Sequence, residues 1–266
     1  MTTYHTHTYR CRHATGDVPD YLKAAKKAGI LELGFSDHCP YPDRRWSESR
    51  MDLEELDGYI RAADGAREAA KDFEIPMKVF TGLECEWGPD IQGFLVDELL
   101  GRRSLDYLAV GIHTYLHKGE WRDSFLISQP RELVSFAETS VKAMESGLFA
   151  FLAHPDLFCF NWAPWDENAV SCARDILAAA QATGTPLEIN GYGFRKPKVR
   201  GDKGHRRPYP HEGFWDLARE YDIACVVNSD AHRPVDIAAG LEEGKSFGAE
   251  RGLRILEKLD LTSRVR

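Results

Sequence analysis

The chain has 266 residues, enough for one large α/β domain that buries its core without disulfides or a structural metal. Its composition, 43% hydrophobic and 29% charged, is that of a globular protein. Its net charge of −8 argues against a large nucleic-acid-binding face, which needs clustered Lys and Arg to neutralise phosphates. We therefore expect a single domain over residues 1–266 and no nucleic acid as a partner.

The cellular setting is predicted from the cysteines and from the apolar runs. The six cysteines form no C-x-x-C pair and no disulfide-framework spacing, which is typical of a reducing compartment. The N-terminus has no apolar signal segment, and no run reaches the ~18 apolar residues of a membrane span. We expect a cytoplasmic protein without a membrane partner; the sequence predicts no oligomeric state.

Three histidines stand within the first thirteen residues. If this stretch is a strand, His5 and His7 point to the same face, where two imidazoles can bind one metal ion. His13 lies past the strand, on a loop indicated by Gly16 and Pro19, and such a loop can bring it back over the same end. The alternative is a solvated N-terminal tail, although the histidines are not adjacent as they are in a purification tag.

Short apolar runs alternate with helical segments along the rest of the chain. After the N-terminal stretch, strands are predicted at residues 31–36, 78–83, 107–112, 149–153, 186–189 and 223–229. Helices are predicted at residues 17–28, 52–73, 91–100, 131–145, 167–182 and 212–221, with a last helix near 250–259 and a Gly-, Lys- and Arg-rich loop at 193–210. Seven short strands separated by helices predict a parallel sheet closed, or nearly closed, into an α/β barrel.

Metal-binding residue types stand at the ends of six of these seven strands; only the sixth ends in Asn-Gly. In an α/β barrel these ends converge on one mouth, where active sites form. The residues are His5, His7, His38, Glu84, His113, His154, Asp230 and His232. Each alone has a structural reading, as a hydrogen-bonded core histidine or a helix N-cap, but the shared placement indicates a metal site.

The number and type of these side chains predict more than one ion. Together with His13 they exceed the ligands that one tetrahedral ion can use, and Glu84 could bridge two ions through its two oxygens. Many imidazoles with few carboxylates favour Zn, Fe or Mn over Mg or Ca. We expect two to three divalent transition-metal ions.

The order and spacing of these motifs resemble the PHP (polymerase and histidinol phosphatase) family. The motifs are His5-x-His7, His13, Asp37-His38, Gly82-Leu83-Glu84, His113, His154 and Asp230-Ala231-His232. The chain length and the segment Asn-Gly-Tyr-Gly-Phe-Arg-Lys at residues 190–196 resemble the histidinol-phosphatase branch. The resemblance implies a distorted (β/α)7 TIM-like barrel with a trinuclear metal centre.

The resemblance also implies which residues hold each ion. It assigns His5, His7, Glu84 and Asp230 to one ion, Glu84, His113 and His154 to a second, and His13, His38 and His232 to a third. Glu86, on the same strand face as Glu84, is the second candidate for the bridging position. Asp37 is a candidate to orient His38 or another ligand.

The activity implied by the resemblance is that of a metal-dependent phosphomonoesterase, with L-histidinol phosphate hydrolysed to L-histidinol and phosphate. In this hypothesis a hydroxide between two ions attacks phosphorus. Glu84, Asp230 and Arg195 are the expected catalytic residues, and Arg195 and His38 are expected to bind the substrate. Arg195 follows the sixth strand, so it could reach the mouth and bind phosphate bidentately. His117 or Asp156 could protonate the leaving oxygen.

One departure leaves the substrate open. Relatives that hydrolyse histidinol phosphate can carry a further phosphate-binding Arg a few residues past the fifth-strand histidine, and residues 155–162 contain no Arg. The alternatives are a phosphatase of another small monoester, a PHP-type phosphodiesterase or nuclease, and a metal-binding protein without activity. An amidohydrolase would use a carbamylated Lys at a strand end, and no predicted strand ends in Lys.

Overall fold

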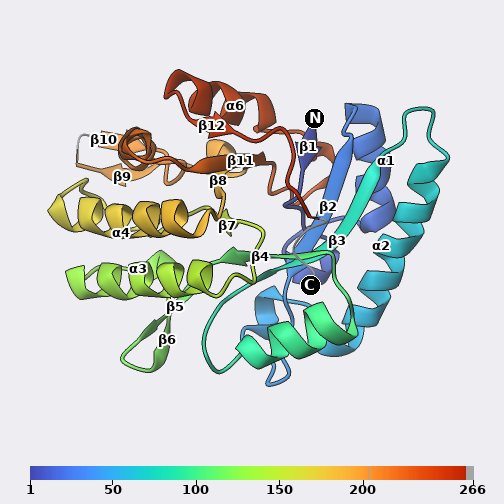
Figure 1. Cartoon of the computed structure of the whole chain (residues 1–266), viewed down its shortest axis with the longest axis horizontal. Coiled ribbons are helices and arrows are strands. Elements are labelled where there is room, and N and C mark those ends of the chain that lie inside the picture. The colour runs from blue at the N-terminus through green and yellow to red at the C-terminus, as the bar shows by residue number, and fades with distance from the viewer. Residues whose placement is uncertain (203, 262–266) are drawn as a thin grey trace.

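The computed structural model describes residues 1–202 and 204–261, and its centre is one curled sheet (Figure 1). The strands follow the order β1-β2-β3-β4-β7-β8-β11-β12, and every neighbouring pair is parallel. Their bounds are Thr2–Thr3, Glu32–His38, Lys78–Cys85, Tyr107–Gly111, Leu152–Ala153, Leu187–Asn190, Ala224–Asn228 and Arg254–Ile255. The second to seventh predicted strands are present, although the fifth is only two residues long. The first covers Thr2–Thr3 and not the stretch with His5 and His7, where Thr6 forms an isolated bridge.

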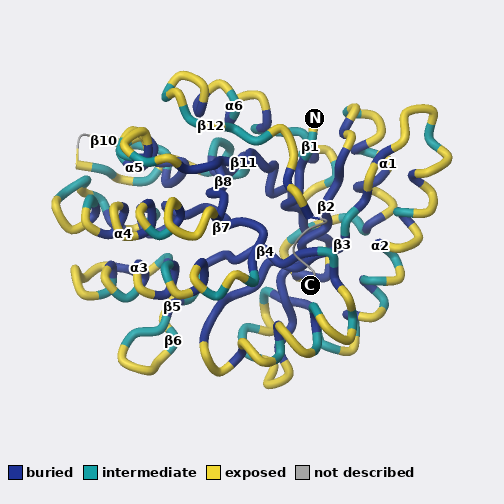
Figure 2. Tube along the Cα trace, viewed as in Figure 1, coloured by how far each residue is buried: buried dark blue, intermediate teal, exposed yellow. Residues whose placement is uncertain are grey.

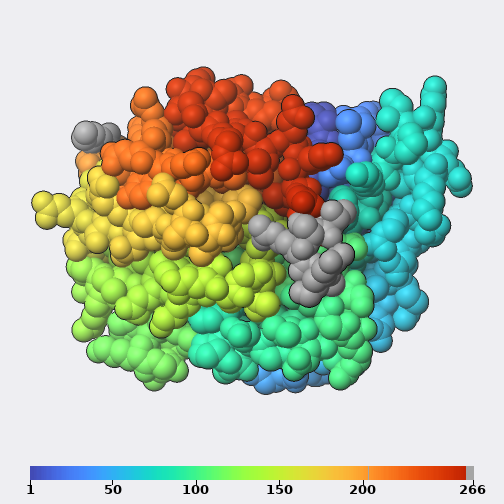
Figure 3. All heavy atoms as spheres, in the orientation of Figure 1, coloured from blue at the N-terminus to red at the C-terminus, as the bar shows by residue number. Residues whose placement is uncertain are grey.

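The sheet closes where the N-terminal segment meets the end of β11. Thr6 forms a parallel bridge with Ala231, and the His7 amide donates to the Ala231 carbonyl at 3.0 Å. In the space-filling view the blue N-terminal residues lie beside the red C-terminal segment (Figure 3). The expected distorted (β/α)7 TIM-like barrel is confirmed, with β12 as an additional strand on the first half of β11.

Helices cover the outside of the sheet, and the strands between them are the most deeply buried part of the chain (Figure 2). Their bounds are α1 Val18–Ala28, α2 Leu56–Lys71, a π-helix Phe94–Arg102, α3 Pro130–Glu145, α4 Glu167–Thr183, α5 Glu212–Leu217 and α6 Leu241–Glu250. α1 begins and ends where the sequence predicts, with Asp17 as N-cap and Gly29 in the left-handed region at φ 69°. Among the described residues, no helix combines the length and apolarity that crossing a bilayer requires.

The predicted last helix, near residues 250–259, is wrong. The helix lies earlier, as α6, and residues 254–255 form β12 instead. Gly252 at φ 68° turns the chain after α6, and Cys225 of β11 pairs with Ile255. An open strand edge and the apolar floor of the barrel, where Leu259 and Leu261 are buried, outweigh the helix propensity of this segment.

Two short hairpins were not predicted. Residues 193–210, expected as a loop, contain β9 Val199–Gly201 paired antiparallel with β10 Gly204–Arg206. A second hairpin, β5 Thr114–His117 and β6 Glu120–Asp123, follows β4. Its two-residue turn is Lys118-Gly119, both at positive φ, the geometry that tight hairpins favour. This second hairpin stands at the mouth of the barrel and forms part of its wall.

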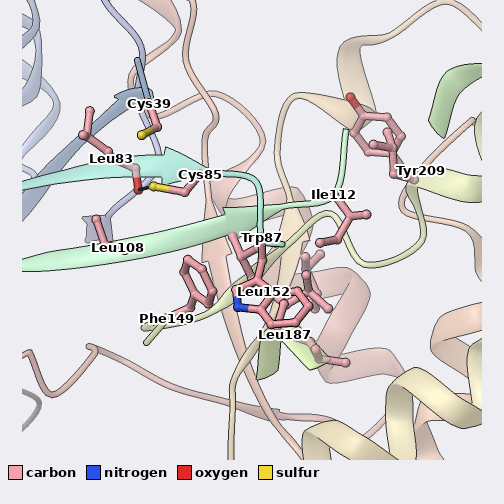
Figure 4. Close-up of a cluster of buried hydrophobic side chains, with 14 of the residues drawn as sticks. Cys39, Leu83, Cys85, Trp87, Leu108, Ile112, Phe149, Leu152, Leu187 and Tyr209 are labelled. Carbon is pink, nitrogen blue, oxygen red and sulfur yellow. Dashed lines mark hydrogen bonds between the residues drawn. The ribbon is translucent and has the colours of Figure 1, made fainter. Parts of the chain in front are cut away.

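Alternation along the strands separates an apolar outer face from an interior that becomes polar near the mouth. On β4, Leu108 and Val110 pack in the outer core beneath the helices, whereas Tyr107 and Ala109 pack inside the barrel. Figure 4 shows outer-core residues from adjacent strands, including Leu83, Leu108 and Leu187, gathered in one cluster. Because its neighbours on β3 face outward, Glu84 must face the interior.

Candidate metal centre

The mouth of the barrel holds a cavity of about 480 Å³, and most of the expected ligands line it. These are His7, His13, His38, Glu84, His113, His154, Asp230 and His232. His5 lies below them and is fully buried, whereas His13 is the exposed member of the group. Residues that are as much as 227 positions apart in sequence (His5 and His232) therefore meet at one end of the sheet, as the alternation of strands and helices predicts.

Glu84 lies in the middle of this group. Its Oε2 is 3.3 Å from His5 Nε2 and 3.0 Å from His38 Nδ1. Its Oε1 is 2.9 Å from His154 Nε2 and 3.6 Å from His113 Nε2. One carboxylate oxygen therefore faces one set of imidazoles and the second faces another, which is the arrangement a bridging ligand needs.

Asp230 lies on the other side of the N-terminal histidines. Its Oδ1 is 3.1 Å from His7 Nε2 and 3.7 Å from His5 Nε2. His232 stacks on His7, with 4.3 Å between ring centroids, and His13 is 4.9 Å from His232 by the same measure. Donor atoms of three residues come within 4.8 Å of one another in several combinations: His5, His7 and Glu84; His5, His154 and Asp230; and His7, His38 and His232.

Many polar atoms of this group are buried and have no hydrogen-bond partner. They are His5 Nε2, both ring nitrogens of His7, His38 Nδ1, Glu84 Oε2, His154 Nδ1 and Asp230 Oδ1. Some approach one another within 4 Å, but without hydrogen-bonding geometry. Buried polar atoms are nearly always satisfied, so a cluster of unsatisfied nitrogen and oxygen donors fits divalent transition-metal ions.

Four of the histidines have Nδ1 bound to an oxygen. His5 Nδ1 is 2.8 Å from Glu188 Oε1, and His113 Nδ1 is 3.0 Å from Glu86 Oε1. His13 Nδ1 is 2.7 Å from the Cys11 carbonyl, and His232 Nδ1 is 3.1 Å from the Asp230 carbonyl. A hydrogen bond donated by Nδ1 leaves the lone pair on Nε2, which is how metal-binding histidines are commonly held.

The charges of the cluster suit a cation. Burial acts to raise the pKa of Glu84, but His5, His113 and His38 hold it well below its ordinary value. The pKa of His38 is well below its ordinary value, first because of burial and then because of the charge of His7. Burial acts to lower the pKa of His5, yet the surrounding carboxylates raise it well above its ordinary value. The Glu84 carboxylate is therefore ionised. His5 holds a proton among the carboxylates, and a metal ion can take the place of that proton.

Two expected ligands have strained backbone. His154 lies at φ 30° and Asp230 at φ 47°, both in the left-handed region that residues other than glycine seldom adopt. Such conformations cost about 1–3 kcal/mol each and collect at functional sites. At these two strand ends the left-handed backbone conformation directs a donor side chain into the mouth.

Glu188 was missed as a site residue. It is fully buried on β8; its Oε1 binds His5 Nδ1 and accepts from Asn228 Nδ2, and its Oε2 accepts from the His154 amide. A carboxylate inside an otherwise apolar predicted strand is the signal that could have identified it, because buried charges require partners. The sixth strand therefore also contributes a side chain to the candidate centre, two residues before its Asn-Gly end.

Glu86 and Asp37 hold ligands in place. The carboxylate of Glu86, the second candidate for the bridging position, accepts from the Thr114 amide and from Arg50 and lies beside His113 Nδ1. It therefore lies behind His113 and not beside Glu84. Asp37 accepts from the His38 amide at 2.9 Å and lies 3.6 Å from His7 Nδ1.

Arg195 is not placed as the sequence suggested. Its guanidinium donates to the backbone carbonyls of Gly191 and Ala239, at 3.1 and 2.9 Å, and it is not among the residues that line the cavity. The two candidates for leaving-group protonation are also outside the lining: Asp156 accepts from the His211 amide, and His117 Nδ1 lies 2.9 Å from a serine hydroxyl of α3. Arg195 holds the loop that carries Tyr192 and Lys196, which do line the cavity.

Comparison with known families and sequences gives a consistent result. The family model for the PHP domain matches residues 3–191. A relative from Deinococcus radiodurans, named as a probable histidinol-phosphatase, is 32% identical over 88% of this chain and 86% of its own length. A second with the same name, from Schizosaccharomyces pombe, is 22% identical over 97% of this chain and 87% of its own length.

Comparison with solved structures supports the fold. The histidinol phosphate phosphatase of Lactococcus lactis, solved in complex with zinc, L-histidinol and phosphate, superposes with a TM-score of 0.72. It covers 97% of this chain and 98% of its own, at 13% sequence identity. At this identity the likeness concerns the arrangement of helices and strands.

Proposed function

The chain belongs to the PHP domain family, and on this premise we propose that it hydrolyses L-histidinol phosphate to L-histidinol and phosphate. The broader assignment, a metal-dependent phosphoric monoester hydrolase, rests on the family match and on the relative that is 32% identical. The finer assignment, to one substrate, is supported by the names of the relatives and by the ligands of the Lactococcus lactis structure.

The observation that carries the proposal is the cluster of unsatisfied donors at the mouth of the barrel. The nine residues proposed as ligands are His5, His7, His13, His38, Glu84, His113, His154, Asp230 and His232. Zn, Fe or Mn would suit this donor set, and two to three ions are proposed from the number of donors. When bound, such ions acidify a water molecule and neutralise charge on phosphoryl oxygens.

The chain's own residues arrange this chemistry. Glu84, between two sets of imidazoles, sets the spacing of the donors, and Asp230 completes the set beside His7. His38 lies on the cavity side of Glu84, where it can also approach a bound substrate. The low pKa of Glu84 keeps this carboxylate anionic and able to bind cations at neutral pH.

The outer part of the cavity fits a leaving group that is aromatic and cationic. The cavity lining includes the aromatic rings of Trp46, Trp121 and Phe125 and the carboxylates of Glu48 and Asp123. L-Histidinol carries an amine, protonated at neutral pH, and an imidazole ring. Aromatic faces and carboxylates are the groups that recognise such a ligand.

The proposal is tested with metal-free protein reconstituted with Zn, Mn or Fe(II) and assayed on phosphate esters. We expect hydrolysis of monoesters, with kcat/KM for L-histidinol phosphate above that for phosphoserine and p-nitrophenyl phosphate by at least roughly tenfold, the discrimination that pocket contacts provide. Cleavage of diesters or oligonucleotides alone would move the assignment to a phosphodiesterase.

A variant of the bridging carboxylate separates metal loss from loss of fold. Glu84→Gln replaces one carboxylate oxygen by an amide nitrogen, which is a poor metal ligand, and removes the negative charge, so bound metal and kcat/KM should fall together, the latter by more than about a hundredfold. Glu84→Asp keeps the charge but shortens the reach, so its defects should be smaller. Full activity in Glu84→Gln, with normal metal content, would remove Glu84 from the centre.

A further inference from the structure

Three cationic side chains from the described residues line the cavity, and they differ in how they are held. Arg122 is exposed and pairs with Glu120 at 2.5 Å. Lys196 is half-buried, with its amine 4.3 Å from the centre of the Tyr192 ring. Arg50 is 3% exposed and is part of the cavity wall. Of the three, Arg50 is the cation whose position the fold fixes.

The guanidinium of Arg50 is only partly satisfied. Its Nη2 donates to Glu86 Oε1 at 2.6 Å, whereas Nε and Nη1 are buried and have no hydrogen-bond partner among the described residues. Leaving a buried donor unsatisfied is costly, and native structures seldom do so without an occupant that the site is built to receive. The partner that is missing must be an acceptor, because a guanidinium has only donors.

Several contacts fix the orientation of this side chain. The guanidinium carbon lies 5.2 Å from the ring centroid of Trp46 and 5.6 Å from that of Tyr41. Trp46 itself lies at φ 57° and meets the ring of Trp121 edge to face. The two rings also contact each other, with 5.4 Å between their centroids, and a guanidinium held against such a pair loses little freedom when it binds a ligand, which favours binding.

Glu86 connects Arg50 to the candidate metal centre. The Glu86 oxygen that accepts from Arg50 is also 3.0 Å from His113 Nδ1, and His113 Nε2 lies 3.6 Å from Glu84. The carboxylate balances the charge of Arg50, and Arg50 lines the same cavity as His38, Glu84 and His113. An anion bound between Arg50 and the proposed metal ions would meet positive charge from both sides.

We propose that Arg50 binds the phosphoryl group of the substrate, with Nε or Nη1 donating to one of its oxygens. The inference rests on the proposed phosphatase function and adds the residue that recognises the phosphate. Nε and Nη1 lie on different edges of the guanidinium, and a hydrogen bond from either charged donor to a phosphate oxygen is stronger than one between neutral groups. Arg50 thereby supplies the cation that residues 155–162 lack and that Arg195, turned to backbone carbonyls, does not present to the cavity.

The test measures inorganic phosphate binding by calorimetry, on protein reconstituted with metal and freed of excess ion. Arg50→Lys keeps a positive charge for Glu86 but lacks the nitrogens Nε and Nη1, and we expect the phosphate dissociation constant to rise by about tenfold to a hundredfold. Metal content should remain that of the wild type. Arg67→Lys is the matched control: Arg67 is a half-buried arginine bound to Asp106 and to β3 far from the mouth, so its variant should bind phosphate normally.

Two outcomes would overturn the proposal. One is unchanged phosphate affinity in Arg50→Lys, particularly if Arg195→Lys weakens binding instead. The other is loss of metal together with phosphate in Arg50→Lys, as we expect for Glu86→Gln, since Arg50 would then act only by holding Glu86 and His113. Should the variant not fold, a crystal structure of the wild type with metal and phosphate decides: a phosphate oxygen must lie within hydrogen-bond distance of Nε or Nη1. Phosphate binding does not require turnover, so a protein inactive on monoesters would refute the phosphatase function without deciding the role of Arg50.

Discussion

The imidazoles of the candidate centre are oriented by neighbouring residues that are not themselves proposed as metal ligands. Glu188 is the clearest of these, because one carboxylate group binds the ring of His5, the backbone of His154 and the amides of Asn190 and Asn228. Its position inside the barrel leaves it no contact with solvent. A single residue on β8 therefore fixes two proposed ligands from other strands.

Replacing Glu188 by Gln should weaken metal binding without removing any ligand. An amide cannot accept as strongly from His5 Nδ1, so the lone pair on Nε2 is less well directed, and metal affinity should fall by about tenfold to a hundredfold. Competition with a chromogenic chelator measures this. Glu32→Gln is the matched control, since Glu32 is also a buried carboxylate but binds Tyr4 at the opposite end of the sheet. Equal metal affinity in both variants would contradict the role of Glu188.

The residues proposed as metal ligands could be predicted from the sequence, as could Asp37 beside His38, whereas the other residues of the site were missed or misplaced. His38, Glu84 and His154 stand at the ends of apolar runs, so chain order alone brings them to one mouth. Arg50 lies in an irregular segment before α2, without periodicity to say which way it points. Arg195 follows a strand as the others do, but its partners, backbone carbonyls of two loops, depend on a fold that the sequence does not display.

At the scale of elements, alternation along β3 and β4 makes room for the centre. Gly111, the last residue of β4, faces the Glu84 carboxylate, and a Cβ at this position would collide with Glu84 Oε1 and with His113. The absence of a side chain at the end of one strand thus allows the carboxylate of the neighbouring strand to lie at the middle of the cluster.

Gly111→Ala should therefore disturb the centre more than the fold. The added methyl group must displace Glu84 or His113, so we expect bound metal and phosphatase activity to be lost while the circular dichroism spectrum is retained. The control is Gly65→Ala on the exposed face of α2, where a Cβ meets nothing within 4 Å and helix propensity should add up to about 1 kcal/mol to the free energy of unfolding. Wild-type metal content in Gly111→Ala would show that the cluster does not depend on this close packing.

Elements with strong local signals were predictable, and those that depend on distant partners were not. α1 carries its own N-cap and C-terminal glycine, so its bounds follow from the sequence. β12 is two residues long and exists because β11 offers it an open edge. Only two residues separate β4 from the hairpin of β5 and β6. The apolar run of β4 gives the stronger strand signal, so the hairpin is not recognised as a separate element.

At the scale of the whole molecule, the candidate centre lies at the seam where the barrel closes. The segment that carries His5 and His7 joins β2 on one side and the end of β11 on the other. Ions bound there would link the first strand of the chain to the last part of the barrel. The closure that completes the fold is therefore also the step that completes the proposed ligand set.

The central claim is that histidines and acids from all parts of the barrel hold a cluster of transition-metal ions at its mouth. Diffraction from crystals grown with zinc, recorded at the zinc absorption edge, tests it most directly. The account predicts two to three anomalous peaks in contact with the side chains of His5, His7, Glu84, His154 and Asp230, among others of the set. Crystals with zinc in solution but no anomalous peak at the mouth would contradict it.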